Sequence, residues 1–128
     1  MKTIVHDPTD GIYASTSDYV HAMEVRNPGR LLCVAGTMGL HPTGAAGTTI
    51  SEQLDLIWDN LRVILASAEM TVDNIVRVTT YLRDRAYSDA NAQARVAALN
   101  GRTVPTTAIV VETLVDEWLA EIEVMAAA

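Results

Sequence analysis

The chain has 128 residues, of which 49% are hydrophobic and 20% are charged, and its formal net charge at pH 7 is −7. This length and composition predict a single globular domain over residues 1–128. The acidic balance, with Lys2 as the only lysine, disfavours a nucleic-acid partner, because phosphate binding depends on clusters of Lys and Arg. Cys33 is the only cysteine, and its place within LLCVAG predicts a small buried hydrophobe without a disulfide partner.

The first residues, MKTIVHDPTDG, contain no apolar segment of the kind that directs secretion, and no run of about 18 apolar residues predicts a membrane span. We therefore expect a cytoplasmic protein with no membrane partner. His6, Asp7 and Asp10 are residue types that bind metals, but they lie in a terminal stretch that is expected to be mobile. No His-x-x-x-His or Cys pair accompanies them, so neither a metal nor a cofactor is predicted.

The first predicted elements in chain order are a strand pair and a helix. Residues 20–27 (VHAMEVRN) alternate, NPGR supplies a turn, and residues 31–36 (LLCVAG) are apolar, which together predict a β-hairpin. A capping box of Thr49 and Glu52 then predicts the start of a helix. The apolar residues that follow recur at helical spacing: Leu54, Ile57, Trp58, Leu61, Ile64, Leu65 and Ala68.

The second half of the chain alternates between strand and helix signals. Residues 75–84 are rich in β-branched side chains and predict a strand, and a second helix is predicted from Ser88 to the Asn100–Gly101 stop. Strands at 106–113 and 119–126 complete the order β-β-α-β-α-β-β. This order predicts an α+β or α/β sandwich of one sheet and one helical layer.

The strands carry apolar residues on both faces, whereas two helices can cover only one face. Leu32, Val34, Ile109, Val111, Leu119 and Met125 cannot all be buried by the two helices. An uncovered apolar sheet face is an association surface, so a closed symmetric oligomer is expected.

Two glutamates stand out in the last strand. Alternation places Glu121 and Glu123 on one face with Leu119 and Met125, while Ala120, Ile122 and Val124 take the other face. One interpretation is that the two acids are solvated positions on a half-exposed strand. The other is that they line a cleft at the subunit interface.

Several stretches, running nearly from end to end, resemble the Rid family of reactive intermediate deaminases, also called YjgF-like or L-PSP endoribonuclease-like proteins. They are DYVHA (18–22) at the family's P-Y-S-x-A position, VAGTMGLHPTG (34–44), EQLDLIWDNLRVILASAEMTVDNIVRVTTYLRD (52–84), Asn91, and VPTTAIVVETLVDEWLAEIEVMA (104–126) at the P-A-R-S-x-V and V-E-I-E-A-I-A signatures. The resemblance implies an α+β, chorismate-mutase-like fold and a homotrimer with a small-molecule site in each intersubunit cleft.

Carried over by position, the resemblance implies that Glu121 is the catalytic residue and that Tyr19, Asn91, Thr107, Ala108 and Ile109 bind the substrate. One position departs from the motif, because Thr107 stands where the family's active deaminases have an arginine that clamps a substrate carboxylate. A threonine offers one uncharged hydroxyl in place of a charged planar fork. Arg26, Arg30, Arg77 and Arg102 are candidates to replace that arginine.

The expected function is therefore hydrolysis or deamination of a small imine, enamine or related unsaturated metabolite, but not of ordinary 2-imino acids. The alternative is a non-catalytic trimer, small-metabolite-binding or stress-associated. Structural interpretations also stay open for single residues: Tyr19 as a packing residue at the head of a strand, Asn91 as a residue satisfied locally beside Ser88, and His21 as a structural side chain that alternates away from Tyr19.

Overall fold

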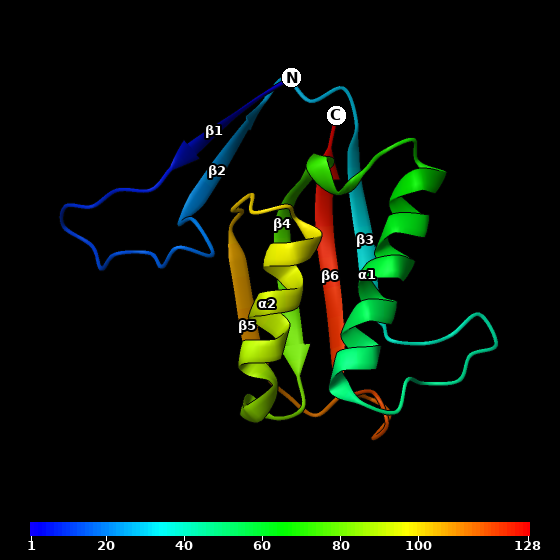
Figure 1. Ribbon diagram of the computed structural model, residues 1–128. Coiled ribbons are helices and arrows are strands. Elements are labelled where there is room, and N and C mark those ends of the chain that lie inside the picture. The colour runs from blue at the N-terminus through cyan, green and yellow to red at the C-terminus, as the bar shows by residue number, and fades with distance from the viewer.

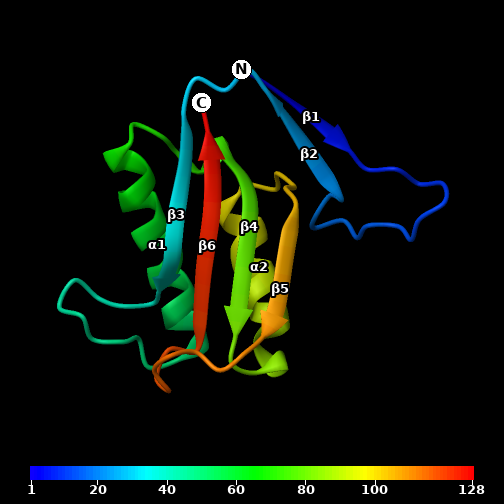
Figure 2. The ribbon, with the colours of Figure 1, turned by 180° about the vertical axis from the view of Figure 1, so that it is seen from behind.

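The main sheet has four strands and carries both helices on one face. In the computed structural model, which describes residues 1–128, the strand order is β3-β6-β4-β5; β4 and β5 are parallel and the other pairs are antiparallel. The strands are β3 (Leu31–Met38), β4 (Ile75–Leu82), β5 (Thr106–Val110) and β6 (Ala120–Ala127). The helices α1 (Ile50–Ser67) and α2 (Ser88–Ala98) lie side by side in front of the sheet, and the opposite face is open (Figures 1 and 2). The predicted α+β fold is confirmed.

Helix α1 begins where the sequence predicts it. The Thr49 hydroxyl accepts a hydrogen bond from the Glu52 backbone N–H at 3.1 Å, so Thr49 is the N-cap. The Glu52 carboxylate does not reach back to Thr49; it accepts instead from the backbone N–H and the hydroxyl of Thr48. Most of the predicted apolar stripe is buried against the sheet, while Ile64 is 36% exposed.

Gln53 is a buried polar residue within this stripe and fixes how α1 meets the sheet. Its side-chain amide donates to the carbonyls of Gly47 and Glu117, and its oxygen accepts from the Leu119 N–H at 2.8 Å. These bonds join the first turn of α1 to the start of β6. The backbone entry into β6 is therefore held by a side chain of α1.

Helix α2 follows the short 3-10 helix η2 (Arg85–Tyr87) and ends at the predicted stop, where Asn100 and Gly101 have φ values of 53° and 78°. A positive φ is the left-handed conformation that commonly ends a helix and suits Asn and Gly. A second 3-10 helix, η1 (Val72–Asn74), leads from α1 into β4. Strands β4, β5 and β6 fall within the predicted ranges except for Ala127, which extends β6.

The predicted hairpin of residues 20–27 and 31–36 is wrong. Strand β2 (Ala22–Arg26) pairs with an N-terminal strand that was not predicted, β1 (Lys2–His6), and the two form a separate sheet that projects past the β5 side of the molecule (Figure 1). The connection does not fold back on β2, because the N–H groups of Gly29 and Arg30 both donate to the Ala128 carbonyl. This segment therefore extends the β3–β6 ladder, and β2 pairs elsewhere.

The two faces of the sheet differ as alternation predicts for β6. Ala120, Ile122 and Val124 are buried under the helices, and Glu121 and Glu123 are half-buried on the open face. In β3 the alternation places Val34 in the core and leaves Cys33 exposed, so the expectation of a buried cysteine is wrong. None of the helices has the length and apolarity needed to cross a membrane.

Candidate functional site

The open sheet face presents polar side chains in two adjacent rows across the strands. In the first row, Glu121 of β6 is paired with Tyr81 of β4, and Tyr81 with Ile109 of β5. In the second, Glu123 is paired with Thr79, and Thr79 with Thr107. Paired residues point to the same side of a sheet. The open face therefore brings together three of the predicted site residues: Glu121, Thr107 and Ile109.

Glu123 is held by a cross-strand hydrogen bond. The Tyr81 hydroxyl donates to its Oε1 at 2.5 Å. This bond, with the added effects of burial and of the negative charges of Glu123 and Glu121, raises the pKa of Tyr81, while the Arg77 charge acts in the opposite direction. Tyr81 is therefore neutral at physiological pH and serves as a donor to Glu123.

Glu121 differs from its neighbour because it accepts no hydrogen bond from the protomer, whereas Glu123 does. Its carboxylate lies over Gly36 of β3, where an added Cβ would collide with Oε1 and would come within 3.0 Å of Cδ. The glycine thus provides the space that the Glu121 side chain occupies. A carboxylate with free acceptor positions on an open face can accept a proton from a ligand or a water molecule.

The other predicted residues line a hollow on the helix side of β5. This hollow has a volume of about 200 Å³. Its lining includes Tyr19, Ser88, Asn91, Thr106 and Ala108. Ala108 alternates with Thr107 and Ile109 along β5, so its side chain faces the helical layer while theirs face the open side.

An ion pair closes one wall of this hollow. Arg95 of α2, whose side chain is only 5% exposed, donates to Asp18 Oδ2 at 2.6 Å and to the Asp18 carbonyl at 3.3 Å. A hydrogen bond from the Thr16 hydroxyl, and next the charge of Arg95, lower the pKa of Asp18 against the effect of burial. These contacts fix the loop that carries Tyr19 against α2.

Asn91 carries an unsatisfied polar atom within this wall. The residue is 2% exposed, and its Oδ1 is buried without a hydrogen-bond partner. The interpretation of Asn91 as locally satisfied beside Ser88 therefore fails for this oxygen. Leaving a buried acceptor unpaired costs about 1–3 kcal/mol, and such costs are often retained at functional sites.

Tyr19 lies in a loop rather than at the head of a strand, because β2 begins at Ala22. Its ring meets the His21 ring edge to face, with centroids 5.8 Å apart, and His21 Nε2 donates to the Tyr13 carbonyl at 2.9 Å. The expectation that His21 points away from Tyr19 is wrong, since alternation applies only within a strand.

A single protomer divides the predicted site into two parts. Glu121, Thr107 and Ile109 face the open side of the sheet, whereas Tyr19, Asn91 and Ala108 lie on the helix side of β5. Strand β5 is the edge strand between these two parts. Any site that uses all six residues must therefore wrap around this edge or be completed by a second molecule.

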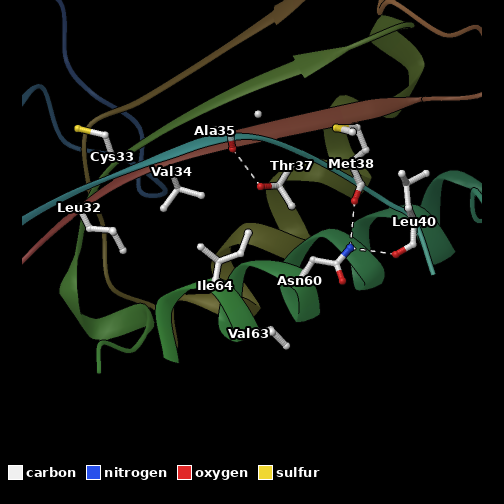
Figure 3. Close-up of a pocket in the computed structure, with 11 residues that line it drawn as sticks. Leu32, Cys33, Val34, Ala35, Thr37, Met38, Leu40, Asn60, Val63 and Ile64 are labelled. Carbon is white, nitrogen blue, oxygen red and sulfur yellow. Dashed lines mark hydrogen bonds between the residues drawn. The ribbon is translucent and has the colours of Figure 1, made fainter. Parts of the chain in front are cut away.

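A larger apolar hollow of about 530 Å³ lies between β3 and α1 and contains none of the predicted residues. Figure 3 shows its lining, in which Asn60 donates to the carbonyls of Met38 and Leu40 at 3.1 and 3.0 Å. These bonds satisfy two carbonyls at the end of the β3 edge. Its lining contains no charged group. The hollow can therefore contact an apolar ligand but has no acid or base for catalysis.

Sequence reasoning missed Tyr81, Thr79 and Gly36 as members of the open face. The signal for the first two was present, since alternation in β4 assigns them to the face opposite Val78 and Thr80. Gly36 could not be found in this way, because its role depends on the cross-strand position of Glu121. The structure also contains no group of three or more His, Cys, Asp or Glu side chains placed to hold a metal ion.

The fold and the open sheet face define a class of small α+β proteins with a two-helix layer on a mixed sheet. The chain belongs to the family described as endoribonuclease L-PSP, whose model matches residues 11–128. No curated protein shows a significant match.

Solved structures of Rid and YjgF-type proteins are similar over most of the chain. A Rid-family protein of unknown function from Yersinia pestis, YyfB, is 28% identical, with all of both chains covered and a TM-score of 0.87. Rv2704 of Mycobacterium tuberculosis, from the YjgF/YER057c/UK114 family, is 26% identical over 86% of each chain, with a TM-score of 0.69. RidA of an Antarctic Psychrobacter is 22% identical over 95% of this chain and 98% of its own, with a TM-score of 0.74, and supports the fold alone.

Proposed function

We propose that the chain assembles as a homotrimer whose intersubunit clefts bind a small unsaturated metabolite, and that Glu121 directs hydrolysis of an imine or enamine there. Membership of the Rid and YjgF-type proteins supports a small-molecule deaminase or binding role in general. The observation that carries the specific proposal is the division of the site: Glu121 has free acceptor positions on an open face, and Asn91 has an unpaired buried oxygen behind the edge strand. A second copy docked at this edge would join the two parts.

The proposed roles follow from the chemistry of the groups. Glu121 accepts a proton from water as the water oxygen adds to the carbon of the protonated C=N group, which gives a carbinolamine. Glu121 then returns this proton to the nitrogen, and the C–N bond breaks with loss of the hydroxyl proton, which leaves a carbonyl compound and ammonia. Tyr19 and Asn91 orient the substrate. Residues Thr107 to Ile109 belong to an edge strand, which leaves alternate backbone N–H groups free to hold a developing oxygen charge.

The substrate is not an ordinary 2-imino acid in this proposal. Thr107 supplies no positive charge at the motif position, and a carboxylate beside Glu121 and Glu123 would meet two negative charges. Charge-assisted hydrogen bonds contribute about 1.5–3 kcal/mol each, so the loss of a bidentate arginine weakens binding substantially. Ribonuclease activity is disfavoured by the net charge of −7.

The test is a panel of imine and enamine substrates, with iminopyruvate followed by semicarbazide trapping as the 2-imino acid. We expect no acceleration with iminopyruvate and turnover of at least one other member. Glu121→Gln should lower that turnover by about 10²–10⁴-fold, the usual contribution of a general base. Glu112→Gln is the matched control, because Glu112 is an exposed acid outside the sheet.

Acceleration of iminopyruvate hydrolysis would refute the argument from Thr107. Turnover that survives Glu121→Gln unchanged would refute the role of Glu121. Saturable binding of a panel member without any turnover would instead support the non-catalytic alternative.

A further inference from the structure

A second hollow on the open sheet face lies beside the acid pair. It has a volume of about 240 Å³, and its lining includes Cys33, Arg77, Thr79, Glu123 and Met125. Arg77 is paired with Met125, one row beyond the pair of Thr79 and Glu123. Arg77 and Glu123 are thus diagonal neighbours, whose separation is about 7–8 Å in a regular sheet.

Arg77 is the arginine in this hollow, and its guanidinium has no partner within the protomer. The other candidates to replace the motif arginine are already used: Arg26 donates to Glu24, Arg30 to the Ala68 carbonyl, and Arg102 to the carbonyls of Val72 and Ile75. Arg77 is exposed and forms no hydrogen bond or ion pair, even with the neighbouring Glu123. Within one protomer its donors are therefore unused, and they could bind a ligand held in a cleft between copies.

The charges along the open face form an ordered series. Glu121 and Glu123 occupy successive rows, and Arg77 occupies the next. The effects of all three charges on the Tyr81 hydroxyl show that they act within one electrostatic neighbourhood. A ligand anion near Glu121 would be repelled by two carboxylates. At the Arg77 end it would meet a guanidinium and the Thr79 hydroxyl, with one carboxylate nearby, that of Glu123, whose Oε1 is already bonded by the Tyr81 hydroxyl.

We infer that Arg77 and Thr79 form an anion subsite. It selects substrates whose carboxylate is several carbon–carbon bonds away from the carbon that reacts beside Glu121. This inference rests on the proposed function of Glu121. Arg77 and Tyr81, the partner of Glu121, are four residues apart along β4, which corresponds to about 13 Å between Cα atoms. The side chains of Arg77 and Glu121 cover part of this distance. The carbon chain of the ligand, with bonds of about 1.5 Å each, covers the rest.

The ligand class therefore differs from 2-imino acids in one respect. In a 2-imino acid the carboxylate is attached directly to the reacting carbon, so it cannot reach Arg77 while that carbon lies at Glu121. An unsaturated acid with its C=N or enamine carbon near one end and its carboxylate near the other can place the reacting carbon at Glu121 and the carboxylate at Arg77.

The test uses stable ketone analogues as probes, with binding measured by calorimetry. These are 4-oxopentanoate, in which three carbon–carbon bonds separate the ketone and carboxylate carbons, pyruvate, in which one bond separates them, and the uncharged 4-oxopentanamide. We expect 4-oxopentanoate to bind the wild type more tightly than either of the others. Arg77→Gln should weaken its binding by about tenfold or more, the loss expected for a charge-assisted contact.

Arg85→Gln is the matched control, because Arg85 is also exposed and unpaired but lies in η2, away from the hollow, and its replacement changes the net charge equally. It should leave 4-oxopentanoate binding unchanged. Glu121→Gln should retain this binding even though it removes the proposed base. A failure of the catalytic proposal is then separable from a failure of the anion subsite.

Three results would overturn the inference: equal binding of 4-oxopentanoate to wild type and Arg77→Gln, binding of pyruvate as tight as that of 4-oxopentanoate, or no detectable binding of 4-oxopentanoate to the wild type. A loss of binding in Arg85→Gln equal to that in Arg77→Gln would also refute it, since the effect would then reflect net charge alone. Circular dichroism of both variants checks that they remain folded.

Discussion

At the scale of single residues, the two glutamates of β6 share a sheet face but have different environments. Glu123 is occupied by the Tyr81 hydroxyl, and Glu121 is left with free acceptor positions over Gly36. Residues with unused hydrogen-bonding capacity on a concave or shared surface are the ones that can act on a ligand. This difference, rather than the Glu-x-Glu spacing itself, is why we propose the catalytic role for Glu121.

The Tyr81 contact gives a prediction for alkaline titration. Because the hydrogen bond to Glu123 raises the pKa of Tyr81 above 10.0, the bonded, protonated form is favoured in the folded state. Its contribution to stability is fully present below the ordinary pKa of tyrosine and is lost as the pH rises through the folded-state pKa.

In a spectrophotometric titration, Tyr81 should therefore ionise at a higher pH than tyrosine in a peptide. Tyr81→Phe should remove this late component and leave three tyrosines. A late component of unchanged size in Tyr81→Phe would contradict the assignment.

At the scale of elements, a loop is fixed to a helix by the Asp18–Arg95 ion pair. The Arg95 side chain is nearly fully buried, so Asp18→Asn leaves a buried cation that faces a neutral amide oxygen and the residue-18 carbonyl in place of a carboxylate. We expect Asp18→Asn to destabilise the fold by about 1.5–3 kcal/mol, the range for hydrogen bonds to charged groups. The value should lie toward the lower end, since the Asp18 side chain is 32% exposed.

Denaturant unfolding of Asp18→Asn against Asp10→Asn, a change of the same kind at an exposed loop position, measures this effect. Because the pKa of Asp18 is lowered in the folded state, the difference between wild type and Asp18→Asn should be present at neutral pH and should shrink as the pH falls through that lowered pKa. An equal stability of the two variants at neutral pH would show that the ion pair does not hold the loop.

The elements also show where sequence reasoning succeeded and where it could not. Helix α1 was predictable because its cap and its apolar spacing are local features, and β6 because alternation is local. The pairing of β2 was not, since the choice between β1 and β3 depends on whether residues 29–30 bind the C-terminus. Local patterns define elements, but pairing is decided by the tertiary structure.

For the candidate site too, some residues could be predicted from the sequence and others only from the tertiary structure. Glu121 and Asn91 were predicted as site residues from resemblance, and each has an unused acceptor in the structure, which supports the proposal for them. Tyr81 and Arg77 became visible only when strand register placed them beside the acids. A continuous apolar run such as LLCVAG predicts that both faces of a strand are buried. Cys33 is exposed in the protomer, so this prediction fails for one face of β3.

At the scale of the whole molecule, the sheet has one covered face and one open face, and the candidate site is divided between the open face and the far side of β5. Apolar and sulfur-containing side chains on the open face, among them Cys33, Ile109 and Met125, lie in reach of solvent in the protomer. A closed symmetric assembly would cover them and would bring a second copy to the edge strand.

The most direct test of this account is the mass of the wild-type protein in dilute solution, measured by size-exclusion chromatography with light scattering. Because the site is proposed to form between copies, the account predicts a mass three times the 13.8 kDa of one chain, maintained on dilution to low micromolar concentration. A stable, folded species with the mass of a single chain would contradict it, since Glu121 and Asn91 would then remain on separate sides of the same sheet.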